Sequence, residues 1–547
     1  MRNIAVACAV LGLAVAAAPA GAGATLELPD VKYAPVQAGG RVKPLDTFAR
    51  ELLVDLSGKD TWEGHEATSV VLSMLADGDT WKQTPILKVQ HLELKEKFAL
   101  QRDRKLFSFQ EILDNRAFIE YAEGLRQSGR DDFDGLEEAA LGVYGKMVQL
   151  DSVSRRLTPR VVPSMQATGD WMSIGELESM QGAPFVAQLV SRWDALQTSA
   201  LAEDPSASGA ALAGWSELIT EQAGFGGVDP RRLGIEVKYN TLHPFRKAWM
   251  LYIVSFVVFL AGWITKKPIV GFVATALLWC GFLFHTGGLL TRQYLAGRPP
   301  ISNLYEALTF VVWGIVFFAI IFEMSQRRRV HGTVAAVLGS IGLVLAETMP
   351  IERELNPLVA VLRSYWMQYH VTCVLLSYSA LTLAAGLAHF HLALEWLAPH
   401  RRELSAKTAS LLYTMMKIGV TFLATGTILG AWWASESWGR YWGWDPKETW
   451  ALITLIGYIA VIHGRFAGWL SPYGVSVANV ATWGLVLFTF YGVNFFLVGL
   501  HSYAGAADAV QIPPLLVVYL VFEAAVIAAG IWYSKSGRLR LRRSSAV

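Results

Sequence analysis

Nine long apolar runs, separated by short polar or charged segments, are the feature that most constrains how this chain of 547 residues can fold. Helices need about 20 residues to cross the apolar layer of a membrane, and most of the runs approach that length. Only 17% of the residues are charged. We therefore predict an all-α polytopic membrane protein with about nine transmembrane helices, near residues 249–265, 268–290, 306–325, 333–347, 369–397, 410–430, 450–468, 475–496 and 513–534.

The residues before the first run divide into a leader and a polar region. Arg2, an apolar stretch from Ile4 to Ala18 and the small residues Ala22-Gly-Ala24 predict a secretory signal over residues 1–24, with an uncleaved anchor as the alternative. Residues 25–248 are polar and mixed in charge, and the apolar spacing in 98–114 and 174–197 favours helices. We expect a mostly helical, soluble extracytoplasmic domain of unknown role.

The distribution of basic residues predicts the orientation. If residue 248 lies outside, the inside loops and tail hold fourteen Lys and Arg residues and the outside loops hold six. Basic loops remain cytoplasmic, so this bias agrees with the orientation that the signal predicts. We expect a bacterial cytoplasmic (inner) membrane protein with residues 25–248 on the periplasmic side. The basic tail 535–547 would be cytoplasmic, serving as a topological anchor near anionic lipid.

A dense group of tryptophans lies between the sixth and seventh runs, in a predicted loop over residues 431–450. Indole rings suit a membrane–water boundary, but such a belt explains one or two tryptophans rather than six within nineteen residues. The alternative is an interfacial belt beside a solvated turn. We favour a shelf for a flat, aromatic, partly charged ligand such as haem, formed by Trp432, Trp433, Trp438, Trp442, Trp444, Asp445 and Trp450.

Two histidines bracket this loop in sequence, and the predicted topology places both on its outer side. Imidazole is a common axial ligand of haem iron, so we predict that His370 and His501 ligate it. His463 lies thirteen residues beyond Trp450, in the inner half of the membrane, where an ionisable residue is a functional candidate. A hydrogen-bonded packing role is the alternative for His463.

Two arginines near the outer face are candidates for pairing with haem propionates. Arg298 precedes the third run, and Arg440 lies within the tryptophan loop. Ser302 or Asn303 is expected to cap the third helix, with Glu306 in its first turn. Asp445 is instead a candidate for holding Arg440 or an indole N–H in place.

The cysteines exclude some functions. The three cysteines lie in apolar runs, and no Cys-x-x-Cys occurs, which argues against thiol–disulfide chemistry in the polar region. The chain also lacks Cys-x-x-Cys-His and is therefore not itself a c-type cytochrome. A net charge of +2 favours no class of partner, and we expect no nucleic acid.

The tryptophan stretch Trp438-Gly-x-x-Trp442-x-Trp444-Asp445-x-Lys447-Glu448 resembles a known signature. This is the WWD domain of haem-handling proteins, found in CcsA (ResC) of system II cytochrome c biogenesis and in CcmC and CcmF of system I. The segments from Pro299 to Glu306 and from Asn494 to Tyr503 are similar to the CcsA branch in particular. The resemblance covers residues 249–534. A weaker similarity, around Gly40–Leu45, links the polar region to a soluble extension of some fused bacterial synthases.

The resemblance implies a site and a reaction. His370 and His501 match external haem ligands, and His463 matches a transmembrane histidine implicated in haem passage. Haem b would be held transiently and non-covalently at the outer face, then attached through thioether bonds to the Cys-x-x-Cys-His of an apocytochrome c. The iron and the cysteines must be reduced, so thiol-reducing factors are indirect partners.

The expected enzyme is therefore a holocytochrome c synthase (haem lyase), of which this chain supplies one subunit. No second multi-span module precedes Trp249, so a CcsB/ResB-like membrane protein is the expected partner. One alternative is a haem transporter or chaperone that delivers haem to a separate lyase. Another is a b-type electron-transfer subunit, which would need histidine pairs at matched depth.

Overall fold

The computed structural model describes most of the chain. The residues described are 30–130, 133–163, 169–180, 184–202, 205–223, 229–326, 329–349, 351–358, 360–497, 499 and 514–544. The signal predicted over residues 1–24 and the proposed ligand His501 lie outside this set.

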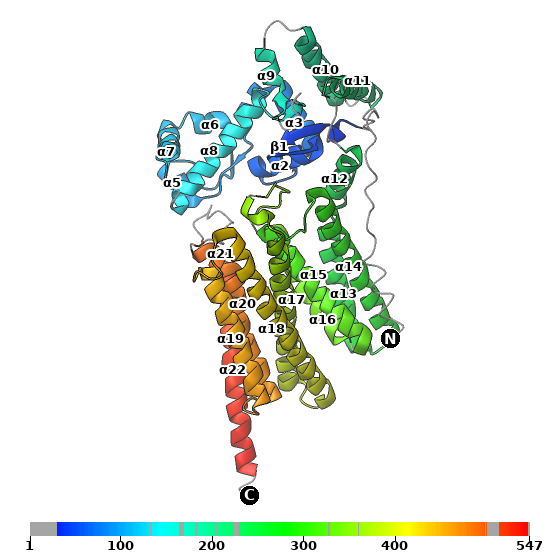
Figure 1. The fold of residues 1–547 in the computed structure, drawn as a ribbon, viewed down its shortest axis with the longest axis vertical. Helices are drawn as coiled ribbons and strands as arrows, with labels where there is room; N and C mark the ends of the chain where they lie inside the picture. The colour runs from blue at the N-terminus through cyan, green and yellow to red at the C-terminus, as the bar shows by residue number, and fades with distance from the viewer. Residues whose placement is uncertain are drawn as a thin grey trace. The chain divides into compact units, whose positions relative to one another are not determined.

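Within the described residues, nine helical segments are long and apolar enough to cross a membrane, which confirms the predicted polytopic α-helical fold (Figure 1). The first span continues from α12 (Pro230–Leu242) into the next helix, with His243 between them in a left-handed conformation. The spanning helices are α13 (Pro244–Thr265), α14 (Pro268–Ala296), α15 (Leu304–Gln326), α16 (Val330–Thr348), α17 (Tyr365–Leu397), α18 (Arg402–Trp438), α19 (Pro446–Phe466), α20 (Pro472–Leu487) and α22 (Pro514–Ser544).

Several helices extend beyond the apolar runs. Capping interactions, rather than hydrophobicity, determine at which residues these helices begin and end. Helices α14, α19 and α20 begin at prolines, which have no N–H to satisfy at that position. Helix α18 ends at Gly439, whose φ of 70° suits glycine. The helix therefore runs through Trp438, and the tryptophan loop is only residues 439–445.

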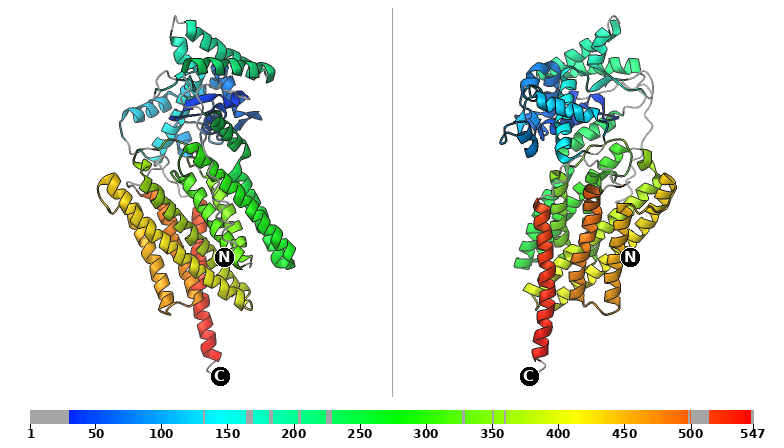
Figure 2. Two further views of the ribbon diagram at one scale, coloured as in Figure 1. Left: turned by 45° about the vertical axis from the view of Figure 1, so that its right-hand side comes forward. Right: turned by 90° about the vertical axis from the view of Figure 1, so that its left-hand side faces the viewer.

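Helix α17 occupies a central place in the bundle. It packs against α15, α16, α18 and α20, and it runs alongside α18 in each view (Figures 1 and 2). Glycines on α18 permit this close approach: a Cβ at Gly419 would lie 2.5 Å from Leu381 of α17. Small residues at helix interfaces serve the same purpose in other membrane proteins.

The end of α20 departs from regular α-helical geometry. A π-helical turn, η3 (Phe488–Gly492), follows α20 and leads into the short helix α21 (Val493–Phe496). A π turn adds a residue to the helical repeat and so rotates the side chains that follow it. Asn494 is thereby presented to the start of α19, as described below.

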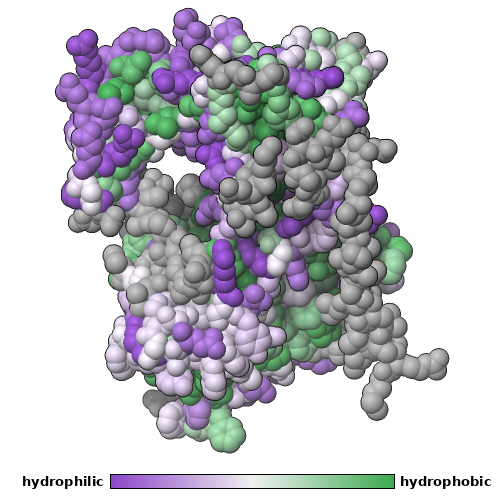
Figure 3. All heavy atoms as spheres, turned by 45° about the horizontal axis from the view of Figure 1, so that its top comes forward, coloured by the Kyte–Doolittle hydropathy of each residue, from purple (hydrophilic) through white to green (hydrophobic). Residues whose placement is uncertain are grey.

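Contacts divide the chain into two compact units. One comprises residues 1–38, 42–84 and 148–237, and the other comprises 39–41, 85–147 and 238–547. Before the spans the described residues are mainly helical: η1 (Val31–Tyr33), α2 (Leu45–Ser57), α3 (Ala67–Ala76), α4 (Gly78–Gln83), α5 (Leu92–Lys97), α6 (Phe109–Leu113), α7 (Arg116–Gln127), α8 (Gly135–Ser154), α9 (Ile174–Ser179), α10 (Pro184–Leu201) and α11 (Pro205–Ala223). The space-filling view shows many hydrophilic side chains at the surface, with apolar patches between them (Figure 3).

The strands before the spans are short. One sheet has the order β2-β1-β7-β8, in which Gln37 pairs with Arg160 and Arg160 with Ser173, both antiparallel. Two further pairs are antiparallel two-stranded ladders. The strands are β1 (Pro35–Ala38), β2 (Arg41–Pro44), β3 (Thr61–Trp62), β4 (His65–Glu66), β5 (Leu87–Lys88), β6 (Leu106–Phe107), β7 (Arg160–Val162) and β8 (Met172–Ser173).

The helix expected over residues 98–114 is wrong for most of its length. Helix α5 ends before Ala99, which has a positive φ of 53°, and β6 pairs with β5. Pairing with a distant strand outweighs the local helical spacing. The helix expected over 174–197 is present as α9 and α10.

Candidate functional site

His370 lies in the second turn of α17 and contacts the last turns of α18. Its Nδ1 is 2.7 Å from the backbone oxygen of Gly426, and its ring stacks on Trp433 with centroids 5.9 Å apart and an angle of 22° between the rings. A carbonyl oxygen only accepts, so Nδ1 carries the hydrogen. In the neutral ring the lone pair is therefore on Nε2, the nitrogen then able to ligate a metal.

The predicted tryptophans separate into buried and exposed rings. Trp433 is 2% exposed and supports His370, so its ring is part of the protein interior. Trp432 is 50% exposed and contacts Trp366, one turn before His370, at 5.3 Å. Trp444 is 71% exposed and lies edge-to-face against Trp442. The exposed aromatic surface is thus formed by part of the predicted shelf.

The Asp445 side chain caps the start of α19. Its side chain accepts from the Lys447 N–H at 2.9 Å, and Glu448 reaches back to the Asp445 N–H at 3.2 Å, which forms a capping box. Glu448 also accepts from the Gly443 N–H at 2.8 Å. These bonds fix the loop just before the helix.

Trp444, directly before this cap, has a φ of 57°. A bulky residue rarely adopts the left-handed region, because its Cβ approaches the following carbonyl oxygen. The loop therefore holds a large exposed indole in a backbone conformation that glycine would adopt more easily. Strain of this kind is typical of functional positions.

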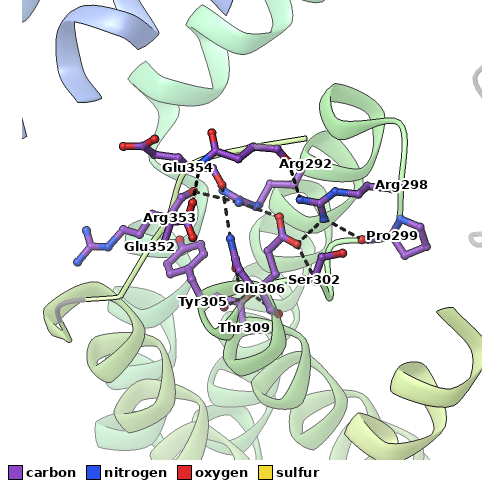
Figure 4. A network of polar contacts seen from close by, with 12 residues as sticks. Arg292, Arg298, Pro299, Ser302, Tyr305, Glu306, Thr309, Glu352, Arg353 and Glu354 are labelled. Atoms are coloured by element: carbon purple, nitrogen blue, oxygen red, sulfur yellow. Dashed lines mark hydrogen bonds and ion pairs between the residues drawn. The ribbon is translucent and has the colours of Figure 1, made fainter. Parts of the chain in front are cut away.

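The two candidate arginines have different surroundings. Arg298 donates to Glu306 at 2.7 Å, and buried Arg292 donates to the same carboxylate at 2.9 Å. Figure 4 shows both guanidinium groups directed at Glu306, whose carboxylate also accepts from the Ser302 N–H at 3.0 Å. Asn303 caps α15, accepting from the Glu306 N–H. Any propionate at Arg298 would have to compete with this network.

Arg440 lies in the tryptophan loop, against Gly443. Its Nη1 is 3.9 Å from Glu448, and this nitrogen has no hydrogen-bond partner among the described residues. A cation with an unsatisfied N–H beside exposed indoles is suited to a carboxylate. Of the two arginines, Arg440 therefore has the surroundings better suited to binding one.

The start of α19 also contacts the segment that leads toward His501. Lys447 donates to the Asn494 side chain at 2.7 Å, and Asn494 donates to the Phe490 carbonyl at 2.7 Å. A Cβ at Gly499 would lie 2.6 Å from an Asp445 carboxylate oxygen. Trp450 packs against Phe488 of η3, with centroids 4.2 Å apart. Phe488, Asn494 and Gly499 thus contact the start of α19, directly after the tryptophan loop.

His463 lies in the last turn of α19 and is exposed. Its Nδ1 is 2.9 Å from the Ile459 carbonyl, so in the neutral ring the lone pair is again on Nε2. His389, on α17, has its Nε2 3.1 Å from Glu523. This contact engages the nitrogen with which His389 would bind iron, so it does not favour His389 as one of the paired ligands of a b-type subunit.

Three structural features near these residues were not predicted from the sequence. They are the glycine contacts of His370, the π turn, and the His389–Glu523 pair. The spacing Gly426-x-x-x-Gly430 in an apolar run and the lone Glu523 in another were available signals. The π turn has no comparable sequence signal.

Comparison with known proteins gives consistent matches. The family described as "Cytochrome C assembly protein" matches residues 301–501. Protein NrfI of Wolinella succinogenes is 31% identical over 500 residues, covering 85% of this chain and 53% of NrfI. The chain thus spans about half the length of that relative, and the match includes part of the polar region.

Shorter relatives match less than half of the chain. Cytochrome c biogenesis protein CcsA of Guillardia theta is 35% identical over 241 residues, covering 39% of this chain and 79% of the relative. CcsA of Synechococcus sp. is 32% identical over 285 residues, covering 45% of this chain and 92% of the relative.

Proposed function

The chain belongs to the CcsA family of cytochrome c biogenesis proteins, and from this premise we propose that it presents haem at the outer membrane face for attachment to apocytochrome c. One observation carries the proposal: half-exposed Trp432 contacts Trp366, one turn before His370, and exposed Trp444 lies in the loop that follows α18. Flat apolar surface beside an imidazole with an Nε2 lone pair is suited to a metalloporphyrin.

The protein's contribution is to position the haem. His370 and His501 serve as axial ligands, the exposed indoles cover a porphyrin face, and Arg440 binds a propionate. The reaction joins each cysteine sulfur to a vinyl carbon while the thiol proton moves to the neighbouring carbon, with no net oxidation. Holding haem, vinyl groups and peptide together supplies the main acceleration.

Haem reaches the site from the inner side by way of His463 in this proposal. The exposed position of His463 on α19 suits a surface completed by another membrane protein. A CcsB/ResB-like partner is the proposed source of that surface. The site would then lie on the periplasmic face of a bacterial inner membrane.

Co-expression with such a partner and an apocytochrome c, in cells lacking other maturation proteins, tests the proposal. Covalent haem on the cytochrome is the expected result. His370→Ala combined with His501→Ala should abolish it, whereas His400→Ala, beyond the far end of α17, should not. Normal maturation by the double variant would contradict the ligand assignment.

The same experiment distinguishes a synthase subunit from a haem transporter or chaperone. A transporter or chaperone would accumulate haem without covalent product until a separate lyase is added. Persistent haem that cycles with quinol and is never transferred would instead indicate an electron-transfer subunit.

A further inference from the structure

The His370 ring is seated on one face of α18. Gly426 accepts from its Nδ1, Gly430 lies under the ring, and Trp433 stacks on it. Positions four and three residues apart share a helix face, so the three residues form a continuous seat. The ring is therefore oriented by the neighbouring helix as well as by its own.

Gly430 leaves no room for a side chain beside the His370 ring. A Cβ there would lie 2.6 Å from Cε1, 2.7 Å from Nδ1 and 3.2 Å from Nε2 of His370. Carbon atoms in contact are ordinarily about 3.5–4.0 Å apart, so a methyl group and the ring cannot both occupy these positions. Imidazole is rigid, and relief requires the ring to turn or the helices to separate.

The Gly426 carbonyl selects one nitrogen of the ring for ligation. It can only accept, so it holds the hydrogen on Nδ1 and directs the lone pair to Nε2. A hydrogen bond of this kind also raises the basicity of the ligating nitrogen. A rotated ring would lose both effects.

We propose that Gly430 and the Gly426 carbonyl are positioning elements for the axial ligand, together fixing His370 for ligation through Nε2. This inference rests on the proposed function, because it assumes that His370 ligates haem. It adds that an apparently inert glycine of α18 determines the ligation state of the iron.

The test uses the full chain purified with its co-expressed partner and bound haem. Gly430→Ala should lower the low-spin, six-coordinate fraction in the absorption and electron paramagnetic resonance spectra, and added imidazole should restore it. The matched control is Gly419→Ala, which crowds Leu381 on the same interface and should leave the spectra unchanged. A folded Gly430→Ala protein with the wild-type spectrum would overturn the proposal.

A second measurement avoids any dependence on the folding of Gly430→Ala. In His370→Gly, imidazole should replace the lost ring and donate its N–H to the Gly426 carbonyl, whereas 1-methylimidazole cannot donate. We expect 1-methylimidazole to bind roughly five- to tenfold more weakly, the effect of one net hydrogen bond. To correct for intrinsic iron affinity, the ratio is compared with that in His501→Gly. Equal ratios in the two variants would contradict the assigned role of Gly426.

These outcomes are distinguishable from failure of the proposed function. A wild-type complex without haem, or a His370→Ala spectrum identical to wild type, would remove the ligand assignment itself. Low-spin haem that depends on His370 but not on Gly430 or on an N–H donor would leave the function intact and refute only the positioning role.

Discussion

Trp444 combines an exposed indole with a left-handed backbone, and these two properties do not favour stability. Little of its apolar ring is buried, and the backbone conformation is unfavourable for any residue with a Cβ. A residue selected for folding alone at this position would be glycine. The indole is therefore best explained by contact with something outside the chain.

Trp444→Gly is accordingly expected to retain or raise the thermal stability of the protein while lowering the amount of bound haem. Relief of the left-handed conformation contributes up to about 1 kcal/mol, partly offset by the greater freedom of glycine in the unfolded chain. Haem per protein after size-exclusion chromatography and the unfolding midpoint in detergent measure the two effects. Trp469→Gly is the control, because Trp469 is also exposed, at 82%, but lies beyond the other end of α19.

The two arginines should respond differently to substitution. Arg440→Gln is expected to reduce haem retention severalfold with little change in unfolding, because its Nη1 has no hydrogen-bond partner in the described structure. Arg298→Gln should mainly lower the unfolding midpoint, because it removes one of two arginines from buried Glu306. Parallel haem titrations and melting curves decide between the roles. Loss of haem in Arg298→Gln without destabilisation would assign the propionate to Arg298 instead.

Residue types and their spacing in the sequence predicted the candidate site residues, but not what surrounds each side chain. The sequence places Trp432 and Trp433 side by side, yet one ring is half exposed and the other buried, because successive helix positions face about 100° apart. Asp445 was predicted as a candidate for holding Arg440 or an indole N–H, and its capping role was not predicted, although the pattern Asp445-x-x-Glu448 before an apolar run is a capping signal.

Among the helices, α22 is held by unusually few contacts. Only 6% of its apolar window is buried, compared with 61% for α17. Its polar links include Glu523, which contacts His389 of α17 and accepts from Tyr519. The His389 Nδ1 also faces the Ala385 carbonyl at 2.8 Å, so the contact between Nε2 and the carboxylate must contain one proton.

Glu523→Leu is therefore expected to destabilise the attachment of α22 by about 1–3 kcal/mol, because it leaves a polar atom of His389 without its partner. The double variant His389→Leu with Glu523→Leu should recover much of this loss, since two apolar side chains can replace a buried polar pair. Thermal unfolding in detergent, with protease sensitivity of α22 as a second readout, measures both. An additive loss in the double variant would show that the pair is not coupled.

The helices themselves could be predicted because length and hydropathy determine them locally, but their ends and partners could not. Helix α18 exceeds its predicted run on both sides, since polar residues such as Arg402 and Glu436 continue a helix without being apolar. His389 and Glu523 are 134 residues apart, and only the folded bundle brings them together.

For the molecule as a whole, orientation is the property most directly open to experiment. In a cysteine-free background, Tyr441→Cys should react with a membrane-impermeant maleimide from the periplasmic side, because the charge bias predicts that the tryptophan loop lies outside. Lys267→Cys, in the loop between α13 and α14, should react only after the membrane is permeabilised. The reverse pattern would invert the topology and place the tryptophan loop in the cytoplasm.

The spanning segments differ widely in length, from 19 residues over Val330–Thr348 to 37 residues over Arg402–Trp438. At about 1.5 Å per residue, these correspond to roughly 29 Å and 55 Å, against a hydrocarbon layer of about 30 Å. A hydrocarbon layer of that thickness covers only part of α18, so its ends, which carry polar residues such as Arg402 and Glu436, extend beyond the layer unless the helix tilts. The acyl-chain length of the lipid therefore affects the surroundings of the site. In nanodiscs of thicker lipid, the end of α18 that bears Trp432 and Trp438 would lie closer to the acyl chains and farther from a water-soluble cytochrome.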